Sequence, residues 1–193
     1  MNLQSLIQNN RSYRRFDANT NISEQILLEL IDLTRYTSSA RNAQPLRYII
    51  SNEKEKNDLI FPTLAWAGYL NDWDGPKESE RPVAYIIVLA ETELKGSFTL
   101  FDAGLATQSI LLGAVERGFG GCIIGAVNKE KLREILDLEN SLEIVCVIAL
   151  GKPAEKVVVE EMKNNDFKYW RDDKGTHHVP KRSLNDILRD LDC

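Results

Sequence analysis

Three arginines stand within five positions near the start of the chain, in the stretch "NNRSYRRF" that runs from Asn9 to Phe16. They could form an ordinary solvated surface, or they could bind an anion, since a planar guanidinium holds a phosphate through two parallel hydrogen bonds. On a helical turn Arg11 and Arg14 would share a face, because residues three apart are neighbours. If the cluster binds an anion, this spacing would bring Arg11 and Arg14 to it together, whereas Arg15 would point elsewhere and be only a surface charge.

A second group of hydrogen-bonding side chains lies in "TSSARNAQP", directly after the second predicted helix. Its polar members could merely satisfy the end of that helix and a turn, a common use of such residues. They could equally form a cluster of neutral donors for a polar ligand. The residues concerned are Ser38, Ser39, Asn42 and Gln44.

The stretch "RGFGGCIIGAV" (117–127) concentrates glycines behind a long apolar helix. Gly118 is predicted to end that helix in a left-handed conformation, with Gly120 and Gly121 as turn residues. The dinucleotide-binding fingerprint does not fit, because its glycines follow a strand and open a helix. The bare backbone of "CIIGA" could instead lie along a flat ring and present N–H groups to it.

Near the C-terminus, "HHVPKRSL" supplies Lys181 and Arg182, a pair that would usually be a solvated surface. His177 and His178 are the only histidines, and their neighbourhood predicts a solvated loop. No Gly-x-Ser-x-Gly nucleophile motif and no set of convergent metal ligands is visible. The chain therefore lacks side chains for difficult chemistry, and a bound cofactor would supply that reactivity while the protein supplies position.

The elements that must position these segments follow from hydrophobic periodicity. Strands are predicted for the apolar runs "LRYIIS", "AYIIVLAE" and "LEIVCVIALGKP". Ser23 is the predicted N-cap of the helix "SEQILLELIDLTRYTSSA". Further helices are predicted for "NLQSLIQN", "SFTLFDAGLATQSILLGAVERG" and "NKEKLREIL" and from Ser183 onward, and the second of these is apolar nearly all round and should be buried on several sides. The combination indicates an α+β or α/β layered protein.

Composition narrows the class of protein. The chain has 193 residues, 24 Lys+Arg against 29 Asp+Glu and a net charge of −5, which argues against a general nucleic-acid or membrane surface. No stretch approaches the ~18 apolar residues of a membrane span. Cys122, Cys146 and Cys193 are an odd number without metal-ligand spacing, which favours reduced thiols in the cytoplasm. The length suggests one domain, residues 1–193. The tail from about residue 164 is polar but closes on an apolar patch, so we expect it to dock on a partner subunit.

Four of these segments, in this order, resemble the nitroreductase family of flavoenzymes: "NRSYRRF", "SSARNAQP", the long helix leading into "GFGGCIIGA", and the closing Lys/Arg pair. The resemblance covers nearly the whole chain. It implies an α+β sandwich in which helices flank a central, mainly antiparallel sheet. It further implies an intertwined homodimer with FMN at the subunit interface.

The resemblance also assigns roles to residues of this chain. Arg11, Ser12 and Arg14 would hold the FMN phosphate and ribityl chain, and Lys181 and Arg182 would reach the same phosphate. The backbone near Ile123, Ile124 and Gly125 would cover one flavin face and donate an N–H to its N5 atom. The other subunit would supply Ser38, Ser39, Asn42 and, more weakly, Gln44.

Two departures from the family affect the shape of the pocket: Leu46 stands where a Trp is frequent, and Arg41 stands where a small residue is common. Family members vary most between residues 66 and 82, where substrates stack. Trp66, Tyr69 and Trp73 are therefore candidate substrate-pocket residues, although one or two of them could equally pack the core or a dimer contact.

The resulting hypothesis is an FMN-dependent oxidoreductase with ping-pong kinetics and no catalytic side chain. NADH or NADPH would reduce the flavin by hydride transfer, and a small acceptor such as a nitroaromatic or a quinone would then be reduced. The alternatives are another redox reaction of the same fold, such as dehalogenation or flavin breakdown, a non-catalytic flavin-binding module, and an interaction protein.

Overall fold

The central strand of the fold is β3 (Ala84–Glu91), in which every residue but the last is buried. In the computed structural model, which describes residues 1–189, β3 lies between β2 (Leu46–Ser51) and β5 (Leu142–Pro153) and pairs antiparallel with both. All three strands are those that the apolar runs predicted. A strand without polar interruption is covered on both faces, and this requirement sets the layers of the molecule.

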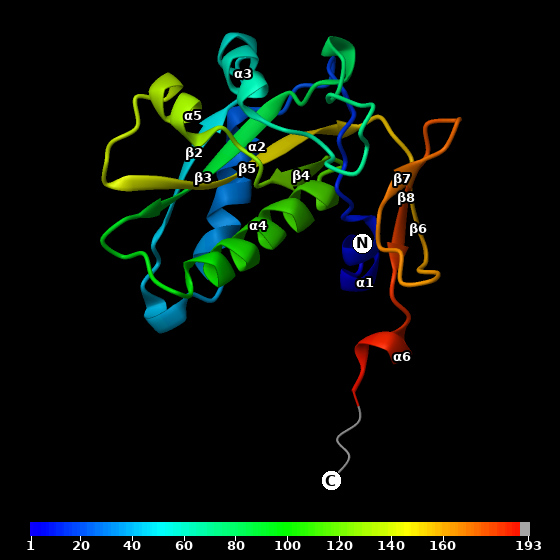
Figure 1. The fold of residues 1–193 in the computed structure, drawn as a ribbon. Helices are drawn as coiled ribbons and strands as arrows, with labels where there is room; N and C mark the ends of the chain where they lie inside the picture. Colours follow the sequence, from blue (N-terminus) through cyan, green and yellow to red (C-terminus); the bar gives the residue numbers. More distant parts are fainter. Residues whose placement is uncertain (190–193) are drawn as a thin grey trace.

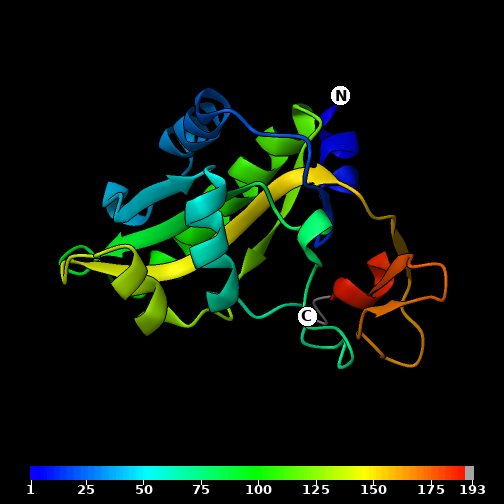
Figure 2. The ribbon, with the colours of Figure 1, turned by 90° about the horizontal axis from the view of Figure 1, so that it is seen from above.

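Helices cover the two faces of the sheet in pairs (Figure 1, Figure 2). α2 (Glu24–Asp32) and α4 (Thr99–Glu116) lie on one face, whereas α3 (Lys54–Ile60) and α5 (Lys129–Ile135) lie on the other. The side chains of β3 alternate between the two cores, as the pleat of a strand requires. Ala84, Ile86 and Val88 pack beneath α2 and α4, and Tyr85, Ile87 and Leu89 pack beneath α3 and α5.

Two further strands complete a five-stranded sheet, since β1 (Phe16–Asp17) and β4 (Gly120–Ile124) both pair with β5. The α+β sandwich with a mainly antiparallel sheet is thereby confirmed. The sequence did not predict β4, because its two leading glycines resembled a turn.

The glycines before and within β4 have different reasons to be glycine. Gly118 ends α4 with φ +79°, as predicted. Gly120 and Gly121 are strand residues, so their prediction as turn residues was wrong. A Cβ on Gly120 would lie 2.6 Å from the ring of Tyr13, and one on Gly121 would lie 2.3 Å from the carbonyl oxygen of Ala149.

The N-terminal helix and the 3₁₀ helices are short. α1 (Leu3–Asn9) precedes the arginine cluster, and Ser23 caps α2 by accepting a hydrogen bond from the Ile26 backbone. 3₁₀ helices span Leu33–Tyr36, Ala40–Asn42, Phe61–Thr63 and Glu78–Glu80. Within residues 1–189 no helix combines the length and the apolar character needed to cross a membrane.

The long helix α4 packs against the sheet, α1, α2 and the 3₁₀ helix that follows α2, so the prediction of burial on several sides is confirmed. It is not buried all round, since Leu100, Phe101 and Leu105 are 74%, 68% and 48% exposed. The part of α4 that carries these three side chains is therefore an apolar surface that stays uncovered within a single chain.

The C-terminal region forms a second, smaller sheet at one side of the molecule, apart from the central sheet (Figure 1, Figure 2). Its strands are β6 (Val157–Glu161), β7 (Trp170–Arg171) and β8 (His177–Lys181), in the order β6-β8-β7, followed by the short helix α6 (Leu184–Ile187). The segment that the sequence indicated as a plain polar tail thus contains two strands that pair within their own chain. The docking of this segment on a partner subunit stays a prediction. The assignment of residues 1–193 to a single domain also stays a prediction.

We expect Gly121→Ala to destabilise the protein by about 1–3 kcal/mol, because the added methyl group would overlap a backbone oxygen that cannot move without breaking the β4–β5 pairing. Chemical denaturation followed by circular dichroism measures the change. The matched control is Gly96→Ala, where a Cβ meets no atom within 4 Å. Equal stability of the two variants would contradict the proposed close packing.

Candidate functional site

A cavity of about 760 Å³ opens where the N-terminal segment, β4 and the second sheet meet. Three of the four segments singled out in the sequence contribute to its lining, and the contributing residues are Arg11, Ser12, Arg14, Ile123, Lys181 and Arg182. None of the described lining residues is acidic. None of the four cations forms an ion pair with any residue between 1 and 189. In a chain of net charge −5, this cavity is a local concentration of positive charge, as an anion site requires.

The segment that carries the arginines is extended, not helical, so the argument from a shared helical face was wrong. Ser12 bridges to Gly121 at the start of β4, and the Tyr13 backbone donates to the Gly121 carbonyl at 3.1 Å. Arg11 and Arg14 reach the same cavity because this extended segment runs along its edge.

The two cavity arginines are held by neutral groups. Arg11 donates from Nη2 to the Ile7 carbonyl at 2.9 Å, and its buried Nε has no partner among the described residues. Arg14 donates from Nη1 to the Ser12 carbonyl at 3.3 Å, and its guanidinium lies 4.8 Å from the centre of the Tyr169 ring. A buried donor without a partner is costly, so the Arg11 Nε is a group that an anionic ligand could satisfy.

Arg15 does not line the cavity, yet it is not a free surface charge. It forms an ion pair with Glu80 at 3.5 Å, and its guanidinium faces the ring of Trp73 at 5.9 Å. Arg171 lies closer to the same ring, at 4.6 Å. Arg15 is therefore a structural residue that joins the segment around Trp73 to the base of the second sheet.

Glu155 connects the arginine segment to the second sheet. Its carboxylate accepts hydrogen bonds from the backbone N–H groups of Arg14 and Arg15, and it pairs with Arg171 at 3.0 Å. Its side chain is only 2% exposed. The sequence offered no signal for this residue, because its partners lie about 140 positions earlier and 16 positions later.

The prediction of a solvated loop around the two histidines was wrong. His177 lies on β8, is 1% exposed and lines the cavity, with Nε2 3.3 Å from Nη1 of Arg14. Burial, and then the nearby Arg14 and Arg171, lower the pKa of His177 to about 4. Because an arginine only donates, the neutral ring accepts at Nε2 and carries its proton on Nδ1.

His178 points to a different place. It stacks on Trp170, with ring centres 4.0 Å apart, and lies between the carboxylates of Glu160 and Asp172 at 3.2 and 3.4 Å. These contacts join all three strands of the second sheet. Within residues 1–189 no group of three or more histidine, cysteine, aspartate or glutamate residues has the arrangement of a metal site.

The three residues predicted near the flat ring separate along β4. Ile123 lines the cavity with its side chain 46% exposed. Ile124 points the opposite way and packs in the core with Leu132, since side chains alternate along a strand, so its side chain is excluded from the cavity. Gly125 follows the end of the strand and does not line the cavity. A role for the backbone of Ile124 and Gly125 stays a prediction.

The polar segment after α2 does not reach the basic cavity within one chain. Ser38, Ser39, Asn42 and Gln44 line a separate cavity of about 250 Å³.

A buried carboxylate organises this polar segment. Asp102, in the first turn of α4, accepts from the Ser39 hydroxyl at 2.7 Å and from the Ala40 backbone at 3.1 Å. Arg41, Asn42 and Gln44 are left-handed, with φ of 56°, 55° and 49°. Such backbone strain persists only where neighbouring contacts impose it.

The candidate substrate-pocket aromatics divide in the same way. Trp66 is buried in the core against Phe61 and does not line the cavity. Trp73 is covered by the two guanidiniums described above. Tyr69 is 46% exposed and contacts Phe167 and Tyr169, both of which line the basic cavity. Of the three, only Tyr69 contacts aromatic residues that line the basic cavity.

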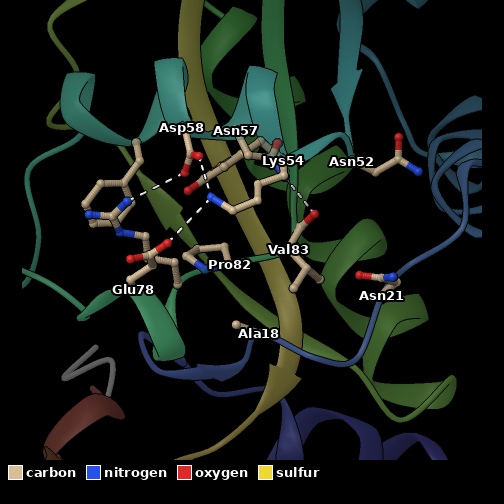
Figure 3. Close-up of a pocket in the computed structure, with 12 residues that line it drawn as sticks. Ala18, Asn21, Asn52, Lys54, Asn57, Asp58, Glu78, Pro82 and Val83 are labelled. Atoms are coloured by element: carbon tan, nitrogen blue, oxygen red, sulfur yellow. Dashed lines mark hydrogen bonds and ion pairs between the residues drawn. The ribbon is translucent and has the colours of Figure 1, made fainter.

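A smaller cavity of about 170 Å³ lies between α3 and the segment before β3 (Figure 3). Its charged side chains pair with one another: Asp58 contacts Lys54 at 2.6 Å and Arg81 at 3.6 Å, and Lys54 also lies 3.6 Å from Glu78. These charges compensate one another, so the cavity offers no unpaired charge to a ligand.

Cys122 and Cys146 line neither of these cavities. Cys122 and Cys146 are free and buried, and burial raises the pKa of the first thiol to about 12 and of the second to about 11. Both are protonated at neutral pH and unreactive. Cys193 lies outside the described residues.

Fold and site together define an α+β protein with a basic, ligand-sized cavity. The Nitroreductase family matches residues 7–152, and the chain belongs to this family. An oxygen-insensitive NADPH nitroreductase of Helicobacter acinonychis is 24% identical in an alignment that covers 83% of this chain and 91% of that protein.

Solved structures support the same fold. An FMN-dependent nitroreductase of Clostridium difficile R20291 has a TM-score of 0.65 at 19% identity, covering 84% of this chain and 92% of its own. A nitroreductase family protein of Streptococcus pneumoniae TIGR4 has a TM-score of 0.69 at 14% identity, covering 98% of this chain and all of its own.

We expect acid to destabilise the protein partly through His177. The pKa of His177 is about 4 in the folded protein and ordinarily 6.5, so the unfolded chain binds this proton at higher pH. The stabilising effect of the neutral ring is complete above pH 6.5 and is lost as the pH falls toward 4. Between pH 7 and 4.5 the melting temperature of the wild type should therefore fall more than that of His177→Gln. Parallel melting curves across this range would contradict the assignment.

Proposed function

We propose that the protein is an FMN-dependent oxidoreductase that takes electrons from NADH or NADPH and reduces a small acceptor such as a nitroaromatic or a quinone. The observation that carries the proposal is the basic cavity, in which Arg11, Arg14, Lys181 and Arg182 lie together without ion pairs among residues 1–189. Family membership and the FMN dependence of a relative with the same fold support the choice of ligand.

The residues present fit the cofactor. A phosphate monoester carries nearly two negative charges at neutral pH, which the four cations can balance. The cavity of about 760 Å³ lies within the usual range for small-molecule sites, ~300–1,000 Å³. Arg11 offers an unpartnered buried Nε to the phosphate, and Ile123 offers an exposed apolar surface to a flat ring. When bound, FMN supplies a ring that accepts a hydride from the nicotinamide and passes electrons to the acceptor in two half-reactions.

The chain contributes binding and orientation to this chemistry. The guanidiniums of Arg11 and Arg14 would hold the phosphate end, together with Lys181 and Arg182 of the same cavity. The backbone N–H groups at the end of β4 would stabilise negative charge that develops on the ring, a preorganised electrostatic effect. Tyr69, which contacts Phe167 and Tyr169 of the cavity lining, would contact the acceptor.

We further propose that the active form is a homodimer with the cofactor at the subunit interface. Within one chain, the segment 38–44 lies in a cavity separate from the basic one, so a second copy would have to supply it. The uncovered apolar face of α4, around Leu100, Phe101 and Leu105, gives such a copy a surface to bury.

Arg11→Ala and Arg14→Ala should each weaken FMN binding by about 1.5–3 kcal/mol, the scale of a hydrogen bond to a charged group. Arg15→Ala is the matched control, because Arg15 pairs with Glu80 and does not line the cavity. It should leave the dissociation constant for FMN nearly unchanged while lowering the melting temperature. Fluorescence titration of the apoprotein with FMN measures all three variants.

Equal losses of affinity at the three arginines would mean that the cluster acts as diffuse charge and that the geometry of the cavity is irrelevant. A wild-type protein that acquires no yellow flavin spectrum on addition of FMN would remove the proposed function altogether.

Phe101→Glu should convert the dimer to a monomer and weaken FMN binding with it, because it places a charge in the centre of the apolar face of α4. Light scattering coupled to size-exclusion chromatography gives the mass, and the absorbance spectrum gives the flavin content. The control is Leu59→Glu, which changes an exposed residue on the opposite face of the molecule, 56% exposed on α3. A wild-type monomer that binds FMN fully would contradict the shared site.

A further inference from the structure

We propose that His177 is a positioning residue for Arg14, whose guanidinium it orients toward the anionic ligand without neutralising its charge. The inference deepens the proposed function and rests on it, since the ligand in question is the phosphate of the cofactor. It names a residue that neither the arginine motif nor the closing Lys/Arg pair contains.

The backbone fixes the imidazole ring from both sides. β8 is the middle strand of the second sheet, and His177 pairs with Val157 on β6 and with Arg171 on β7. Its own N–H donates to the carbonyl of Lys156 at 2.8 Å. The ring of Tyr169 packs against the imidazole, with centres 5.2 Å apart. A side chain held in this way, and 1% exposed, has little freedom to leave its place.

Arg14 is held at three points, and none of them is a carboxylate. Nη1 contacts the Nε2 atom of His177 at 3.3 Å and the Ser12 carbonyl at 3.3 Å, and the guanidinium lies over the Tyr169 ring. A carboxylate would hold the arginine more strongly, but it would also cancel the charge that a phosphate needs. A neutral imidazole orients the guanidinium and leaves that charge available.

Glu155 shows the contrast within the same region. Its carboxylate forms an ion pair with Arg171. From Arg14 it accepts a hydrogen bond of the backbone N–H only, and it does not pair with the guanidinium. The charge of Arg171 is thereby compensated by a carboxylate, and the residue is structural. The charge of Arg14 is not compensated in this way and remains available to a ligand.

A purely structural role for His177 explains the site less well. Its Nδ1 is buried and has no partner among the described residues, and a buried unsatisfied donor is unfavourable. An apolar side chain of similar size would fill the same space without that cost. The imidazole differs from such an apolar side chain in its Nε2 atom, which contacts the Arg14 guanidinium.

The test is a double-mutant cycle on the dissociation constant for FMN, measured by fluorescence titration of apoprotein carrying His177→Leu, Arg14→Ala or both. His177→Gln and His177→Asn form the matched pair, because the Gln amide reaches the position of Nε2 whereas the Asn amide reaches only that of Nδ1. Circular dichroism verifies that each variant is folded.

We expect His177→Leu and His177→Asn to weaken FMN binding about tenfold, the effect of losing one hydrogen bond to a charged group, and His177→Gln to stay within about threefold of the wild type. In the Arg14→Ala background, His177→Leu should cause no further loss, since the residue acts through Arg14. If His177→Leu does not fold, the comparison of Gln with Asn still decides.

The inference is overturned if the two single losses add in the double variant, if Gln and Asn behave alike, or if His177→Leu binds FMN as the wild type does. Failure of the proposed function has a different signature, namely a wild type that binds no FMN. In that case the same cycle is read with inorganic phosphate as the ligand and the shift in melting temperature as the signal. Equal shifts in the wild type and His177→Leu would then overturn the inference.

Discussion

The carboxylate of Glu155 holds together the two parts of the chain on which the candidate site depends. It accepts from the backbone N–H groups of Arg14 and Arg15 on the N-terminal segment, and it pairs with Arg171 on β7 of the second sheet. These same two regions line most of the basic cavity, and Gln108 and Leu111 of α4 and Ile123 of β4 complete its lining. Four like charges in one cavity repel one another, so the structure needs an anchor that does not neutralise them. Glu155 provides that anchor outside the cavity.

The cationic residues of this region divide by their partners. Arg15 and Arg171 pair with carboxylates and cover Trp73, and burial together with Arg15 lowers the pKa of Arg171. Arg11 and Arg14 contact only carbonyl oxygens, an aromatic ring and an imidazole. The arginines whose charge is compensated by carboxylates are thus separate from the arginines whose charge remains available to a ligand. The first pair shapes the cavity, and the second pair gives it its chemical character.

The sequence predicted the elements that depend on local pattern. The three apolar runs became β2, β3 and β5, and Ser23 begins α2 as expected, because periodicity and capping are properties of neighbouring residues. β4 escaped prediction because its glycines are required by contacts with Tyr13 and the Ala149 carbonyl, which lie far away in the chain.

The same distinction applies to the candidate site. Arg11, Ser12, Arg14, Lys181 and Arg182 were predicted from the order of short motifs, and they line one cavity. Glu155, His177 and Asp102 were not recognised, because each has at least one partner more than 60 positions away. For His177 the neighbouring sequence suggested a solvated loop, and for the two carboxylates it offered no signal. Burial and pairing, which only the fold reveals, give them their roles.

The central claim is that this cavity recognises a phosphate, and a comparison of FMN with riboflavin tests it most directly. The two ligands share the same ring and ribityl chain and differ by the phosphate group alone. Titration of the wild-type apoprotein should show FMN bound at least about 100-fold more tightly than riboflavin, as expected for two or more charge-assisted hydrogen bonds. Equal affinities for the two ligands would contradict the account.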